Sequence, residues 1–185
     1  MRTLLLAAAV LLATGHAALA QTVKFDEENR TLSIVAKNGR KHNFENVRQK
    51  PVRSLDSGYL FYTVRTGGGF ENDGDSVFSY RLANGAVKRM FKSLDNVGKI
   101  QPVATKKGIQ GAVITTESSA MNSPVIYVVH ADKGKVWGTP TRDYASEIVD
   151  LKGDMLKIAI YKGDFEEKTA KLEKTTTLSF SKLLR

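Results

Sequence analysis

The chain has 185 residues, with 28 Lys and Arg against 19 Asp and Glu, and it contains no cysteine. The length suits one compact domain, and an apolar content of 42% excludes wholesale disorder and a fibrous protein. Without cysteine the chain has no disulfide framework, thiolate nucleophile, zinc ribbon or iron–sulfur cluster.

The first twenty residues have the pattern of an export signal. Arg2 provides a positive start, Leu4 to Ala13 form a short apolar run, and Ala18-Leu19-Ala20 is a small-residue cleavage site. We therefore expect residues 1–20 to be cleaved after Ala20, leaving residues 21–185 as a single all-β domain. No later apolar run approaches the roughly 20 residues that a membrane helix needs. A short exported chain without cysteine is typical of the bacterial periplasm, which is the location we expect.

The mature chain is basic, but its basic residues are spread along it. Residues 21–185 carry 27 basic and 19 acidic side chains, a net charge of +8, and the densest basic segments are pairs such as Lys88-Arg89 and Lys106-Lys107. For an exported protein we do not expect nucleic acid as a partner. The anions outside the inner membrane are cell-wall polymers, lipopolysaccharide, anionic lipids and acidic proteins. A solvated surface that keeps the protein soluble accounts for the same composition.

Strand-like segments dominate the mature chain. Three of them are rich in β-branched and aromatic residues and are bounded by turn residues: Tyr59–Val64, Val77–Leu82 and Val125–Val129. No segment has a convincing helical stripe. Phe165–Glu173 is the best helical candidate, and it fits equally well as a polar loop before the alternating strand Thr175–Phe180.

Hairpin turns recur at a regular spacing. Four segments have turn composition: Asn38-Gly39, Asn84-Gly85, Asp132–Gly134 and Lys152–Asp154. The first three turn glycines are 46 and 49 residues apart, within the ~40–50 residues of a four-stranded propeller blade. Because a closed propeller has at least about four blades, we expect an all-β, antiparallel hairpin meander with incomplete, propeller-like sheets. A β-sandwich with a coincidental repeat is the alternative.

The mature chain has few residues suited to catalysis. His130 follows the strand Val125–Val129, and Asp132 on the same face could orient its ring, which is how a catalytic dyad begins. No Gly-x-Ser-x-Gly elbow supplies a nucleophile, and we interpret His130 as a structural histidine. Ser179–Lys182 matches Ser-x-x-Lys, but we expect it on a strand and without the partner motifs of that chemistry. We therefore expect neither an enzyme nor a cofactor.

The segment Gly67–Asp75 is the most distinctive part of the chain, because it concentrates acidic residues between two strong strands. We interpret it as a hairpin tip that is either simply solvated or in contact with a partner. Its candidate partner-binding residues are Phe70, Glu71, Asp73 and Asp75. Calcium binding by Asp73, Asp75 and the Asn72 carbonyl stays open. The ligand order does not match an EF-hand loop, and we predict no metal site.

A second long tip, residues 117–124, is rich in small and hydroxyl-bearing side chains and ends at Pro124. Such residues form turns well, and they also make hydrogen bonds inside another protein's cleft. Loops on a rigid scaffold are where binding usually resides. The tip lies between the strands Ala112–Thr115 and Val125–Val129, so we expect it to project from a hairpin.

An exported, small, all-β chain with propeller-like hairpins and a Ser-rich tip resembles the periplasmic immunity proteins of type VI secretion amidase effectors. The resemblance covers roughly residues 108–160. The chain lacks the cysteines that some family members carry. In that family such a tip enters the effector's cysteine–histidine cleft. The resemblance therefore implies a secreted peptidoglycan amidase as the protein partner. It implies that four residues of the tip enter the cleft: Ser118, Ser119, Asn122 and Ser123. We also expect Glu117, the first residue of the tip, to contact the partner.

Two functions of different classes follow. The first is a protein-binding inhibitor of the immunity type, which inserts the Ser-rich loop into the active site of a cell-wall-degrading effector. The alternative is an envelope binding or scaffolding module for an anionic cell-wall polymer or an acidic protein. That module would use scattered Lys and Arg together with aromatic residues: Tyr59, Phe61, Tyr62, Phe78 and Tyr80. The oligomeric state is not predicted.

Overall fold

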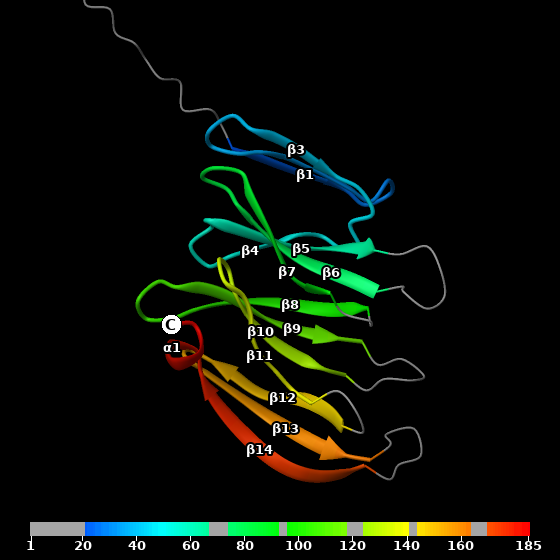
Figure 1. Ribbon diagram of the computed structural model, residues 1–185, viewed down its shortest axis with the longest axis vertical. Coiled ribbons are helices and arrows are strands. Elements are labelled where there is room, and N and C mark those ends of the chain that lie inside the picture. Colours follow the sequence, from blue (N-terminus) through cyan, green and yellow to red (C-terminus); the bar gives the residue numbers. More distant parts are fainter. Residues whose placement is uncertain (1–20, 67–73, 93–95, 118–123, 141–143, 164–169) are drawn as a thin grey trace, which may run out of the picture.

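The computed structural model describes residues 21–66, 74–92, 96–117, 124–140, 144–163 and 170–185 (Figure 1). Most of these residues lie in strands that form four antiparallel sheets. Sheet 1 contains β1 (Thr22–Asp26), β2 (Thr31–Val35) and β3 (Lys41–Phe44). Sheet 2 contains β4 (Val52–Arg53), β5 (Tyr59–Thr66), β6 (Gly74–Arg81) and β7 (Ala86–Lys92). Sheet 3 contains β8 (Val97–Ala104), β9 (Gln110–Thr116), β10 (Ile126–His130) and β11 (Gly134–Gly138). Sheet 4 contains β12 (Tyr144–Lys152), β13 (Met155–Lys162) and β14 (Lys171–Ser179).

Within each sheet the strands pair in chain order, which confirms the predicted hairpin meander. The predicted turns are also confirmed. Gly39, Gly85 and Gly134 have φ angles of 81°, 75° and 99°, a region that glycine adopts without strain. They occupy corresponding turns of sheets 1, 2 and 3, so their regular spacing reflects a structural repeat.

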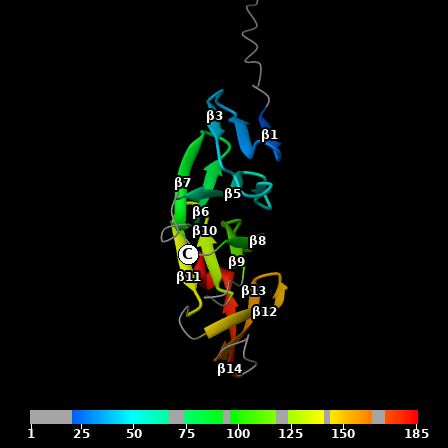
Figure 2. The ribbon, with the colours of Figure 1, turned by 90° about the vertical axis from the view of Figure 1, so that its right-hand side faces the viewer.

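The four sheets follow one another along the long axis of the molecule, and none of them closes on itself (Figures 1 and 2). The fold is therefore all-β and propeller-like but incomplete. A two-sheet β-sandwich, the alternative prediction, does not describe four successive sheets.

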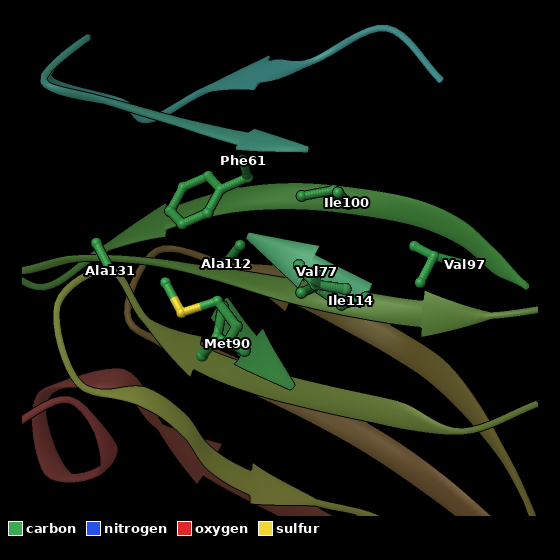
Figure 3. Close-up of a cluster of buried hydrophobic side chains, with 9 residues drawn as sticks. Phe61, Val77, Met90, Val97, Ile100, Ala112, Ile114 and Ala131 are labelled. Atoms are coloured by element: carbon green, nitrogen blue, oxygen red, sulfur yellow. The ribbon is translucent and has the colours of Figure 1, made fainter. Parts of the chain in front are cut away.

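Three layers of apolar side chains hold the sheets together. The first layer, between sheets 1 and 2, contains Leu32, Ile34, Ala36, Val47, Leu60, Tyr62, Tyr80 and Leu82. The second layer, between sheets 2 and 3, contains Phe61, Val77, Met90, Val97, Ile100, Ala112, Ile114, Val129 and Ala131 (Figure 3). The third layer, between sheets 3 and 4, contains Val103, Val113, Ile126, Val128, Leu156, Ile158, Ile160, Phe180 and Leu184.

Successive residues of the middle strands supply different layers, because side chains alternate across a sheet. On β5, Leu60 and Tyr62 pack in the first layer, whereas Phe61 packs in the second. On β9, Ala112 belongs to the second layer and Val113 to the third. Sheets 2 and 3 are thus covered on both faces, which explains why their central strands read as nearly continuous apolar runs.

The outer faces of the two end sheets carry many polar side chains, although sheet 4 also exposes Val149, Met155 and Leu172. On sheet 1, Lys24, Ser33 and Asn43 are exposed side by side in register, and on sheet 4 Lys157 and Thr177 are exposed in the same way. The stack therefore ends on both sides without presenting a continuous apolar sheet face.

The C-terminal residues differ from the prediction. The strand β14 stops at Ser179, and residues Phe180–Leu183 form the short helix α1. Phe180 and Leu184 are fully buried in the third layer. The helical interpretation of residues 165–173 is wrong for 171–173, which belong to β14, and residues 165–169 lie outside the described part.

The turn before β13 holds the start of this helix. The Asp154 carboxylate accepts hydrogen bonds from the Ser181 N–H at 2.8 Å, the Ser181 hydroxyl at 2.7 Å and the Ser179 hydroxyl at 2.7 Å. These bonds, those from Ser181 foremost, lower the pKa of Asp154 below its ordinary value. The two serines of the Ser-x-x-Lys match, Ser179 and Ser181, are therefore engaged in structural hydrogen bonds to Asp154.

The strands turn at two opposite edges of the stack. The turn edge, on the left in Figure 1, carries the tight turns β2–β3, β6–β7, β8–β9, β10–β11 and β12–β13. The loop edge is the opposite one, where β5, β9 and β13 end and β6, β10 and β14 begin.

No helix within the described ranges is long and apolar enough to cross a membrane.

Candidate partner-binding edge

Both segments predicted to contact a partner connect strands at the loop edge. Residues 67–73 stand between β5 and β6 of sheet 2, Gly74 and Asp75 begin β6, and residues 117–124 stand between β9 and β10 of sheet 3. Of their predicted contact residues, Asp75 and Glu117 belong to the described part of the chain. The others lie outside it: Phe70, Glu71, Asp73, Ser118, Ser119, Asn122 and Ser123.

Asp75 is the second residue of β6 and is fully buried. Its Oδ2 accepts a hydrogen bond of 2.8 Å from the Val97 N–H, and its Oδ1 lies 3.6 Å from Nε of Arg48. A buried carboxylate needs such partners to offset the loss of hydration. We predicted Asp75 as a residue that touches a partner; its carboxylate instead faces inward and ties sheet 2 to the start of sheet 3.

The same carboxylate bears on the calcium question. Its two oxygens are directed toward a backbone N–H and a guanidinium group, whereas calcium sites are built from several oxygen ligands around the ion. Within the described ranges, no group of three or more His, Asp or Glu side chains is placed to hold a metal ion.

Glu117 is exposed and is the first residue after β9. Its backbone N–H donates a hydrogen bond of 2.9 Å to the carbonyl of Asn96. Asn96 directly precedes Val97, which holds Asp75. Two consecutive residues, Asn96 and Val97, therefore connect the base of the 67–75 segment to the base of the 117–124 segment.

The second segment is also fixed where it returns to the sheet. Thr116 and Val125 form two hydrogen bonds of 2.9 Å. The Thr116 N–H donates to the Val125 carbonyl, and the Thr116 hydroxyl accepts from the Val125 N–H. Beside it, the Ser146 N–H of β12 donates to the Pro124 carbonyl at 3.1 Å. The loop edge is thus braced across sheets 2, 3 and 4, and we call these joints the loop-edge brace (Asp75–Val97, Asn96–Glu117, Thr116–Val125 and Pro124–Ser146).

The sequence indicates two tips, which lie mostly outside the described residues, but it gives no sign of the residues that join their bases. Asn96, Val97 and Ser146 stand in no recognisable motif, and their part in the brace is made by backbone groups. Any residue type except proline supplies the same N–H, so composition carries no signal for such a contact.

The structure does not assemble a dyad from His130 and Asp132. Nδ1 of His130 accepts hydrogen bonds from the N–H groups of Asp132 at 3.0 Å and Lys133 at 3.3 Å. Burial, followed by the charge of Lys133, lowers the pKa of His130 below its ordinary value. The ring therefore acts as an acceptor that shapes the β10–β11 turn, in agreement with the interpretation as a structural histidine.

The Asp132 carboxylate is engaged elsewhere. It accepts two hydrogen bonds from Nη2 of Arg81, at 2.9 and 3.0 Å, and one from the Tyr59 hydroxyl at 2.8 Å. Arg81 also lies over the Tyr59 ring, 5.3 Å from its centroid. This cluster joins sheets 2 and 3 at the turn edge, and Asp132 does not orient the imidazole.

The aromatic residues predicted for an envelope-binding surface belong to the interior, so that part of the alternative hypothesis is wrong. Phe61, Tyr62 and Tyr80 are at most 1% exposed. Tyr59 and Phe78 are half-buried against the second and first layers. An alternating strand in a middle sheet buries both sets of side chains, and no exposed aromatic stripe remains on β5 or β6.

The sequence matches no protein-family model and no curated protein. Among solved structures, the chain is similar to the β-propeller domain of the Trilobed protease from Pyrococcus furiosus, with 10% identity, a TM-score of 0.49, and coverage of 85% of this chain and 52% of that one. It is also similar to an acylaminoacyl peptidase from Pyrococcus horikoshii, with 13% identity, a TM-score of 0.41, and coverage of 85% and 30%. A third similar structure is an uncharacterised protein from Listeria monocytogenes, with 11% identity, a TM-score of 0.40, and coverage of 67% and 39%. The chain thus spans about half or less of these proteins, and the likeness is one of sheet arrangement alone.

Proposed function

We propose that the mature chain is a periplasmic, protein-binding inhibitor of the immunity type, which blocks the active site of a cell-wall-degrading effector with the segment 117–124. The observation that carries this proposal is the loop-edge brace. It fixes both ends of the segment and joins them to the base of the acidic 67–75 segment, so the two predicted tips share one rigid base.

A braced base favours inhibition by insertion for a thermodynamic reason. Binding immobilises loops and side chains, and each immobilised side chain costs about 0.5–1.5 kcal/mol. A loop whose two ends are already fixed by Thr116, Val125 and Pro124 loses less freedom when a cleft closes around it. Steric occlusion of the effector's cleft is then sufficient, and no catalytic residue is required of the inhibitor.

Charge supports the same function through the rate of association. The mature chain carries a net charge of +8, and complementary charge raises association rates with an acidic partner. The resemblance to immunity proteins adds the expected reaction class of that partner, namely hydrolysis of an amide bond in peptidoglycan.

The test is capture followed by inhibition. Residues 21–185 are immobilised and exposed to extracts of the source cells and of competing bacteria, and the column is washed at moderate and then at high salt. We expect one stoichiometric protein to survive the high-salt wash, to degrade purified peptidoglycan, and to lose that activity when residues 21–185 are added.

Two charge-reversing variants locate the surface. Glu117→Arg changes the exposed residue at the loop edge, and Asp150→Arg makes the same charge change at an exposed position on the outer face of sheet 4. We expect Glu117→Arg to weaken inhibition more than tenfold, since the longer and oppositely charged side chain no longer matches the local surface of the cleft beside the inserted segment, although the effector is acidic overall, and Asp150→Arg to leave it within twofold. Equal behaviour of the two variants, or a captured protein without activity on peptidoglycan, contradicts the proposal.

A further inference from the structure

A second surface lies where the outermost strands of sheets 2 and 3 run side by side. A Cβ placed on Gly134 of β11 would lie 3.4 Å from the Met90 carbonyl of β7 and 3.8 Å from Cε of Lys88. The two strands therefore touch, and their exposed side chains form one strip. We call this strip the β7–β11 seam, and its cations are Lys88 of β7, Lys135 of β11 and Lys133 of the turn that leads into β11.

The seam gathers positive charge that no carboxylate in the described part of the chain neutralises. All three cations are exposed. Within the described ranges none of them forms an ion pair with an acidic side chain; Lys133 Nζ donates to the backbone carbonyl of Arg185. The acidic residue nearest in sequence, Asp132, is held by Arg81 of the neighbouring sheet. The seam therefore carries a net positive charge along two adjacent strands.

Half-buried aromatic rings form the floor of the seam. The rings of Phe91 and Tyr127 pack with their centroids 4.4 Å apart. Nζ of Lys135 lies 5.3 Å from the centroid of the Tyr127 ring, a cation–π contact. Phe91 and Tyr127 are half-buried residues that pack against the second layer, so the strip combines aromatic residues with charge.

Protection of sheet edges explains only part of this pattern. Lysines on an edge strand discourage pairing with another chain, and mixed charges also serve that purpose, as Lys171, Glu173 and Lys174 do on the edge strand β14. The seam instead concentrates one sign of charge at the contact between two strands. Burial is the main cause of the lowered pKa of His130; the charges of Lys133 and Lys88 lower it further, and the charge of Asp132 raises it.

We propose that the β7–β11 seam binds a strand of an anionic polysaccharide. Its anionic groups pair with Lys88, Lys133 and Lys135, and its sugar rings lie against Phe91 and Tyr127. A membrane surface is the less favoured ligand, because membrane attachment relies on apolar side chains that enter the lipid. Among the described residues, Val87 is the one large exposed apolar side chain on either strand. The seam is formed by strand surfaces and does not include the loop-edge brace, so this site is independent of the inhibitor function proposed above.

The test uses dextran sulfate as the anionic polysaccharide and neutral dextran of equal length as the uncharged control. Binding to residues 21–185 is measured by isothermal titration calorimetry, because Trp137, the single tryptophan, packs against the third layer on the other face of sheet 3. We expect saturable binding to dextran sulfate that weakens as salt increases, and at least tenfold weaker binding to neutral dextran.

Two double variants with the same change of net charge separate the seam from general basicity. Lys88→Gln/Lys135→Gln removes two seam cations, and Lys24→Gln/Lys41→Gln removes two exposed cations from the outer face of sheet 1. We expect the seam variant to bind at least tenfold more weakly, with the slope of log K against log salt reduced by roughly 1.4, as for two lost contacts to a single-stranded polyanion. The sheet 1 variant should bind within twofold of the parent protein.

Circular dichroism of each variant verifies that it is folded. Equal weakening by the two double variants overturns the proposal, because net charge alone then accounts for binding. Binding to phosphatidylglycerol vesicles without binding to dextran sulfate also overturns it, and assigns the seam to a lipid surface.

Discussion

Gly111 lies where the backbone of β9, the backbone of β10 and the C-terminal segment come closest together. It stands opposite His130 in the sheet. A Cβ at this position would lie 2.4 Å from the Val129 carbonyl oxygen and 2.9 Å from Cδ1 of Leu184. Carbon–oxygen contacts in sheets lie at about 3.3–3.6 Å, so Gly111→Ala forces a backbone shift of most of an ångström or displaces Leu184.

The expected loss of stability follows from these two contacts. An extra methyl group in a packed interior costs about 1–3 kcal/mol, and partial loss of the fully buried Leu184 adds a fraction of the about 2–5 kcal/mol that Leu→Ala costs in cores. Removing a glycine recovers about 0.5–1 kcal/mol through the unfolded chain. We expect Gly111→Ala to lower the free energy of unfolding by about 2–4 kcal/mol, which corresponds to a fall in Tm of roughly 4–16 °C.

The assay is urea unfolding followed by far-UV circular dichroism, with Gly98→Ala as the matched control in the same sheet. A Cβ on Gly98 would meet the flexible Glu117 side chain at 3.0 Å and the Thr115 carbonyl at 3.5 Å, so this variant should stay within about 1 kcal/mol of the parent protein. Gly111→Ala combined with Leu184→Ala should cost less than the sum of the two single changes, because one of the two clashes is then absent. Equal stability of Gly111→Ala and Gly98→Ala contradicts the predicted clash at Gly111.

Three further predictions concern buried and hydrogen-bonded polar groups. The Tyr62 hydroxyl is buried without a hydrogen-bond partner among the described residues, and burial raises its pKa. Tyr62→Phe should therefore increase the free energy of unfolding by about 1 kcal/mol in urea titrations. A decrease of that size contradicts this prediction. Burial lowers the pKa of His130 below its ordinary 6.5, so its stabilising contribution is present above that pH and is lost as the pH falls through the folded-state value. The free energy of unfolding should therefore decline between about pH 7 and pH 5. The decline should be smaller in His130→Asn, which retains an acceptor for the Asp132 N–H. Identical pH profiles of the two proteins contradict the role given to His130. Asp154→Ala removes the acceptor for Ser181 at the start of α1 and should speed digestion of the C-terminal residues by carboxypeptidase, whereas an unchanged rate contradicts the anchoring role.

The fold class was predictable because the turns and the strands have strong local signals. Asn38-Gly39 and Asn84-Gly85 require a positive φ that few other residues adopt, and Gly39 and Gly85 have it. The spacing of the turn glycines then disclosed the repeat of sheets. The end of β14 was misjudged because Phe180 continues the alternation of the strand, while the signal that ends the strand is Asp154, 26 positions away in the sequence.

The candidate site was predictable only in outline. The composition of residues 67–75 and 117–124 indicates tips, but whether an acidic residue at the base of a tip faces water or the interior depends on the neighbouring sheet. Asp75 illustrates this, since its partners Val97 and Arg48 come from distant segments. The seam was hidden for the same reason: Lys88 and Lys135 are far apart in sequence and meet because β7 and β11 are the outermost strands of successive sheets.

The three separate apolar layers have a consequence for how the molecule opens. Apolar layers pack against both faces of sheets 2 and 3, whereas they pack against only one face of sheets 1 and 4. The other face of each end sheet is in contact with water. The free energy of local opening should therefore rise from the ends of the stack toward its middle. Amide protons of β5, β6, β9 and β10 should exchange with deuterium most slowly, and those of β1 and β14 should exchange first, so that the molecule unravels sheet by sheet from its ends while the braced loop edge of the central sheets remains in place.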